Sequence, residues 1–110
     1  MVNWTGDLDY SGGGVLRISK LRLHDGGLVV AGTSISSDGH WSFDARLLDQ
    51  GPTSKFRYEA NRLVAREQGV MSDPFSLVMT VSERDSELFV VGEWRELGDT
   101  FPFDGTLYSE

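Results

Sequence analysis

The sequence predicts an all-β protein, an eight-stranded antiparallel up-and-down barrel in which each strand pairs with the next to form a meander. Three observations support this fold class. Apolar and polar residues alternate with a period of two along most of the chain, as they do in strands with one buried face. Turn signals rich in glycine, aspartate and serine separate the alternating segments. The 110 residues suffice for one domain, residues 1–110, containing strands and links of ordinary length.

The clearest hairpin covers residues 27–47. Its second half alternates strictly, and the apolar members are Trp41, Phe43, Ala45 and Leu47. Asp38-Gly39 precedes this run, and Asp-Gly between two alternating segments is a strong hairpin signal because glycine accepts the positive φ of a tight turn. We therefore expect two antiparallel strands joined near Ser37.

Two further strands are expected before this hairpin, at residues 2–10 and 15–23, with a glycine-rich turn between them. The second strand changes parity halfway, because its early and late apolar residues fall on opposite sides. These residues are Leu16 and Ile18, then Leu21 and Leu23. One extra residue near Ser19-Lys20 restores the register, so we predict a β-bulge there.

After a loop at residues 49–53, the segment from Ser54 to Asn61 alternates and favours a strand. Residues 59–68 are also rich in good helix formers and are followed by Gly69, so a short helix around residues 60–68 is the alternative.

Three clear strands follow, at residues 75–82, 88–95 and 100–108. Because the chain begins and ends in strands, the first and last can pair and remove the exposed sheet edges. A two-sheet sandwich, or a seven-stranded barrel carrying a helix, is the competing fold.

The hairpin at residues 27–47 is similar in sequence to a later part of the chain. Residues 25–47 align with residues 85–107 without a gap, and identical residues include Leu28 with Leu88, Gly32 with Gly92 and Phe43 with Phe103. Strand alternation alone produces part of this agreement, so either duplication or alternation accounts for it. In both cases, we expect the two hairpins to occupy opposite walls of the barrel, related by a pseudo-two-fold axis.

The net charge of −7 argues against binding to nucleic acid, which requires clustered lysine and arginine. The absence of cysteine excludes disulfides and thiolate metal sites and fits a cytoplasmic location. The N-terminus lacks the pattern of a signal peptide, although a secreted chain without its leader would look the same. No apolar run is long enough to cross a bilayer, so no membrane role is expected.

No enzymatic constellation stands out, so we expect a protein without catalytic residues, metal or cofactor. His24 and His40 lie in or beside turns, without the spacing of a metal site. A Gly-x-Ser-x-Gly elbow is absent, and no cysteine can act as a nucleophile. A cyclase or isomerase in a barrel cavity is a third hypothesis, for which the sequence gives no positive sign.

The predicted interior is more informative. Aromatic residues fall on the inner faces of different strands, namely Trp4, Trp41, Tyr58, Trp94 and Phe101. Such side chains either form the walls of a ligand cavity or fill the barrel completely. Ser34 shares the inward parity, and so does Arg62 if the fifth strand runs that far, whereas a shorter strand leaves Arg62 in solvent. A buried arginine needs an anionic partner. The candidate ligand-binding residues are therefore Ser34, Trp41, Tyr58, Arg62 and Trp94.

An N-terminal strand bearing Trp4 and Gly6, successive hairpins and an aromatic-lined interior resemble the calycin group of lipocalins and streptavidin-like barrels. The likeness covers the whole chain in pattern. Lipocalins open with Gly-x-Trp, whereas this chain has Trp4-Thr5-Gly6, and its Gly92-Glu93-Trp94 comes on the seventh predicted strand. The resemblance also extends to small bacterial barrels of undefined role, and it carries over no ligand-contacting residue.

Two functions remain open at this level. The first is a non-enzymatic barrel that binds a small, largely apolar ligand at its open end, and this ligand is anionic if Arg62 lies inside the barrel. The second is an acidic protein-interaction module, an inhibitor or adaptor, whose barrel is filled by side chains. A void of a few hundred Å³ distinguishes them. Val78 and Val91 lie on predicted outer faces, and an outer sheet face that includes them is the candidate contact of a homodimer.

Overall fold

The computed structural model describes residues 2–52 and 55–110, and ten antiparallel strands but no α-helix lie within these ranges. The strands are β1 (Trp4–Tyr10), β2 (Val15–His24), β3 (Gly27–Ser36), β4 (Gly39–Asp49), β5 (Arg57–Leu63), β6 (Arg66–Glu67), β7 (Val70–Met71), β8 (Phe75–Arg84), β9 (Glu87–Glu96) and β10 (Asp99–Ser109). The expected strand start at Ser54 and loop end at Thr53 lie outside the described residues.

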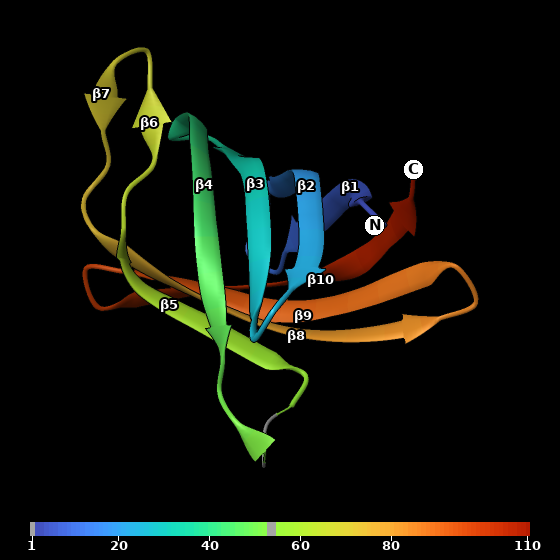
Figure 1. Cartoon of the computed structure of the whole chain (residues 1–110). Coiled ribbons are helices and arrows are strands. Elements are labelled where there is room, and N and C mark those ends of the chain that lie inside the picture. The colour runs from blue at the N-terminus through green and yellow to red at the C-terminus, as the bar shows by residue number, and fades with distance from the viewer. Residues whose placement is uncertain (1, 53–54) are drawn as a thin grey trace.

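Eight of these strands form a closed barrel, as the alternation predicts (Figure 1). The order around the barrel is β3-β2-β1-β10-β9-β8-β5-β4, and β4 pairs back onto β3. The first and last strands pair from Trp4 with Ser109 to Tyr10 with Phe103. This pairing confirms the barrel and rules out the two-sheet sandwich.

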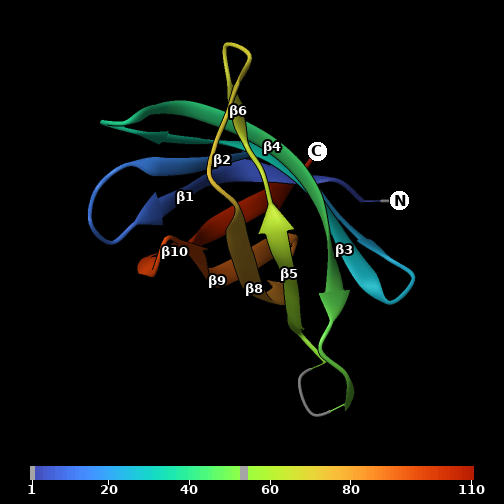
Figure 2. The ribbon, with the colours of Figure 1, turned by 90° about the vertical axis from the view of Figure 1, so that its left-hand side faces the viewer.

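The remaining two strands, β6 and β7, form a small hairpin outside the barrel wall. The hairpin follows β5 and attaches to β4 where Arg66 pairs with Ser42. It projects beyond the end of the barrel in both views (Figures 1 and 2). The barrel therefore carries this hairpin at only one of its two ends.

The short helix considered around residues 60–68 is not present, and that alternative is wrong. Strand β5 continues to Leu63, and residues 66–71 pair as the β6–β7 hairpin. Gln68 and Gly69 both have positive φ, 48° and 84°, as in a two-residue hairpin turn. Gly69 therefore terminates a strand rather than a helix.

The predicted bulge in β2 is confirmed. The register between β2 and β3 shifts between Ile18 and Lys20, which leaves Ser19 without a partner residue. As a result Ile18 and Leu21 both point inward and are buried, although they differ in parity. The bulge thus keeps both halves of a ten-residue strand packed on the same core.

Aliphatic and aromatic side chains fill the middle of the barrel. Its fully buried members include Leu8, Leu16, Leu28, Leu47, Leu77, Met79, Leu88 and Leu107. Nearer one end, Phe75 stacks on Trp94 with ring centroids 3.7 Å apart, and Phe43 packs edge-on against both rings. These contacts form a dense layer across the barrel.

Outside the barrel, the two valines considered for self-association differ. Val91 is 61% exposed, but Val78 is only 5% exposed and lies between Glu59 and Glu93 on the neighbouring strands. Val78 therefore adds little apolar surface to this face, and the homodimer stays a prediction.

The β3–β4 and β9–β10 hairpins are equivalent in register and lie on opposite walls of the barrel. Gly32 pairs with Phe43, and Gly92 pairs with Phe103 in the same position. In both cases a neighbouring strand passes very close to the glycine, through the carbonyl oxygens of Arg17 and Val78 respectively. The strand order places β9 four strands from β3 and β10 four strands from β4, which is the arrangement expected of a pseudo-two-fold relation.

This close approach predicts that Gly92→Ala destabilises the barrel. The added Cβ would collide with the Val78 carbonyl and come within 2.7 Å of the Phe103 ring. We expect the free energy of unfolding to fall by about 2 kcal/mol or more, as for other overpacked cores. Denaturant unfolding measures it.

Gly12→Ala is the matched control, because a Cβ at this turn position meets nothing within 4 Å. Its unfolding free energy should stay within about 0.5 kcal/mol of the unsubstituted protein. Equal stability of the two variants would contradict close packing at Gly92.

Candidate ligand-binding site

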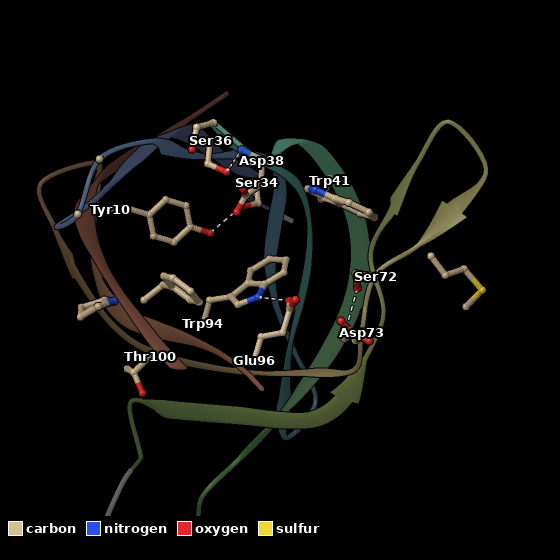
Figure 3. Close-up of a pocket in the computed structure, with 16 residues that line it drawn as sticks. Tyr10, Ser34, Ser36, Asp38, Trp41, Ser72, Asp73, Trp94, Glu96 and Thr100 are labelled. Atoms are coloured by element: carbon tan, nitrogen blue, oxygen red, sulfur yellow. Dashed lines mark hydrogen bonds between the residues drawn. The ribbon is translucent and has the colours of Figure 1, made fainter. Parts of the chain in front are cut away.

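A cavity of about 610 Å³ opens at the end of the barrel where the β6–β7 hairpin projects. Residues of several barrel strands and of the neighbouring turns line it (Figure 3). The barrel strands contribute large or polar side chains to this lining, including Tyr10, Ser34, Trp41, Trp94, Glu96 and Phe101. The interior is thus filled in its middle and hollow at this end.

Aromatic side chains form much of the cavity wall. Trp94 is only 5% exposed and is held in place by its stack on Phe75. Tyr10 packs edge-on against Phe103, with ring centroids 5.9 Å apart. Trp41 is half-buried on β4, and Phe101 is 47% exposed at the rim. These rings provide an apolar surface whose inner part is fixed by packing.

Two hydrogen bonds orient polar groups inside the cavity. The hydroxyls of Tyr10 and Ser34 lie 2.9 Å apart, which joins β1 to β3. The indole N–H of Trp94 donates to Oε1 of Glu96 at 3.0 Å. Figure 3 shows Tyr10 on one side of the space enclosed by the strands, and Trp94 and Glu96 side by side, joined by their hydrogen bond. The cavity therefore combines apolar walls with a few oriented polar atoms, as ligand sites do.

The environment of Tyr10 favours its neutral form. Burial raises the pKa of the phenol to about 12, and the negative charge of Glu96 adds to the rise, while the hydrogen bond with Ser34 works against it. Tyr10 therefore remains a neutral hydroxyl over the physiological range.

The structure brings together three of the five predicted site residues. Ser34, Trp41 and Trp94 all line the cavity, as the inward parity of their strands requires. Tyr58 also points inward and is 8% exposed, but it pairs with Asp49 and Met79 and does not line the cavity. Alternation predicts the face of a strand correctly and leaves the height along the barrel open.

Arg62 is exposed and lies outside the cavity, so its predicted inward placement is wrong. The register between β5 and β8 shifts between Ala60 and Leu63, and Arg62 adopts a positive φ of 58° within this irregularity. A bulge reverses the parity of the residues beyond it. An anionic ligand therefore loses the inward cation that was its only support.

Sequence reasoning missed the acidic residues of the site. Glu96 shares the inward parity of Trp94, but the alternation places the end of the seventh strand at Arg95, one residue too early. Asp38 and Asp73 belong to connections, where alternation gives no orientation. Extending the predicted seventh strand by one residue, to position 96, would have placed Glu96 on the inner face.

No group of three or more His, Asp or Glu side chains suited to a metal ion occurs within residues 2–52 and 55–110. Over the same ranges, no helix is long and apolar enough to cross a membrane.

Comparisons with protein-family models, with curated proteins and with solved structures found no match. The closed eight-stranded antiparallel barrel is compatible with the calycin fold. The architecture alone carries that resemblance.

The raised pKa of Tyr10 predicts a loss of stability at high pH. Between pH 10 and about 12 the unfolded chain releases the phenol proton while the folded chain retains it. Unfolding is therefore favoured as pH rises through this window, by about 3 kcal/mol in total.

Denaturant unfolding of the unsubstituted protein and of Tyr10→Phe at several pH values tests this. The unfolding free energy of Tyr10→Phe should change less with pH across this window. The absorbance titration of the folded variant at the phenolate band should lack the ionisation step that occurs at the highest pH. Parallel curves would contradict the proposed environment of Tyr10.

Proposed function

We propose that this protein is a non-enzymatic binding barrel that holds a small, largely apolar organic molecule in the cavity at its open end. The observation that carries the proposal is the cavity itself, whose volume of about 610 Å³ falls in the range of small-molecule sites. Membership of the calycin group and a cytoplasmic location remain expectations.

The arrangement of the cavity supports binding in three ways. The rings of Tyr10, Trp41 and Trp94 line the cavity and offer apolar contacts to a ligand. Trp94 is preorganised by its stack on Phe75, so little conformational freedom is lost when a ligand contacts it. The opening at the rim gives a ligand access without a change in the barrel.

The alternative of an acidic interaction module with a filled barrel is supported less well. A module of that kind has side chains throughout its interior, whereas the hollow end is large enough for a small molecule. A small-molecule site is therefore the function to test first.

Intrinsic tryptophan fluorescence tests the proposal directly. Trp41 and Trp94 line the cavity, whereas Trp4 is 4% exposed and pairs with Ser109 near the chain termini. A panel of small aromatic and aliphatic molecules should contain ligands that shift or quench the emission in a saturable manner. Absence of any saturable change across the panel would contradict the proposal.

Trp41→Ala should weaken the binding of such a ligand by about tenfold, as expected for loss of a central aromatic contact. Tyr108→Ala is the matched control, because Tyr108 is 55% exposed and does not line the cavity. Calorimetric titration measures both affinities, and denaturant unfolding verifies that each variant is folded. Equal weakening in both variants would argue against a site at Trp41.

A further inference from the structure

The charged side chains that line the cavity are all acidic. Glu96, Asp38 and Asp73 contribute carboxylates, whereas no lysine, arginine or histidine is among the lining residues in the described part of the chain. The cavity of a protein with a net charge of −7 thus concentrates negative charge where a ligand would enter. An anionic ligand would meet repulsion from all three carboxylates.

Glu96 is the carboxylate that lies among the aromatic rings. It follows Trp94 by two residues on β9, so both side chains point inward, and one of its oxygens accepts the indole N–H at 3.0 Å. Its side chain is half-buried, and no ion pair joins it to a cation within residues 2–52 and 55–110. A carboxylate that is partly removed from water gains most from a positively charged partner.

The aromatic rings favour the same partner. The negative face of an aromatic ring attracts a cation, and tryptophan and tyrosine are the strongest side chains in this respect. Tyr10, Trp41 and Trp94 line the cavity together with Glu96, and the Tyr10 hydroxyl is already engaged with Ser34. A carboxylate among aromatic rings is an arrangement that fits an organic ammonium group.

We propose that the ligand of this cavity is an organic amine, whose protonated nitrogen lies against Glu96 among the rings of Tyr10, Trp41 and Trp94. This inference rests on the proposed function and specifies its ligand class. It replaces the anionic ligand expected from Arg62.

Probes that share one carbon frame and differ in charge test the inference. On the phenylethyl frame they are 2-phenylethylammonium, 2-phenylethanol and phenylacetate, and matched sets on benzyl and butyl frames extend the series. We expect the ammonium member to bind about tenfold more tightly than the alcohol, and the carboxylate to bind most weakly. Calorimetric titration at pH 7 gives the three affinities.

Glu96→Gln identifies the carboxylate. The amide oxygen of glutamine can still accept the Trp94 N–H, so the variant removes charge with little change in shape. We expect the affinity for 2-phenylethylammonium to fall by about tenfold and that for 2-phenylethanol to stay unchanged. Asp104→Asn is the matched control, because Asp104 is exposed and lies outside the cavity. Its substitution changes the net charge of the protein by the same amount as Glu96→Gln.

The outcomes separate this inference from the proposed function. If the alcohol or the carboxylate binds as tightly as the amine, the inference is overturned while the binding barrel stands. If Asp104→Asn weakens the amine as much as Glu96→Gln, general charge rather than Glu96 is responsible and the inference is again overturned. If no member of any set binds, both proposals fail.

Discussion

Main-chain pairing between the first and last strands is the constraint on which the rest of the structure depends. Because β1 and β10 join, every barrel strand has a neighbour on each side, and the inward side chains share one interior. Closure also fixes how wide that interior is. Phe43, Phe75 and Trp94 span it in one layer, and the space beyond them remains open toward solvent.

The period of two in the sequence predicted the barrel because each strand buries one face. It also predicted the bulge near Ser19, because a single inserted residue is the simplest way to bring both halves of a strand onto one core. It was less decisive at residues 60–68, where good helix formers suggested a helix. Local propensity is weak compared with the pairing that β6 and β7 make, so the chain forms a hairpin there.

The candidate site was only partly predictable, for two physical reasons. Alternation distinguishes inside from outside but not one end of the barrel from the other, so Tyr58 was grouped with Trp41 and Trp94 although it lies elsewhere. Alternation also fails at irregularities. A shift of register turned Arg62 outward, and a strand one residue longer than expected brought Glu96 inward, so the charge of the site was predicted with the opposite sign.

The barrel wall is not equally strong all the way round. Strands β4 and β5 are joined by only two described residue pairs, Leu48 with Glu59 and Asp49 with Tyr58, whereas β9 and β10 share ten. Beyond these pairs the inserted hairpin takes over at Ser42, so much of β4 has a continuous ladder on one side only. Local opening of a protein is easiest where few hydrogen bonds join neighbouring segments. We therefore expect backbone amides along the β4–β5 seam to exchange with solvent faster than those of the β9–β10 ladder, through local opening of the barrel wall without global unfolding.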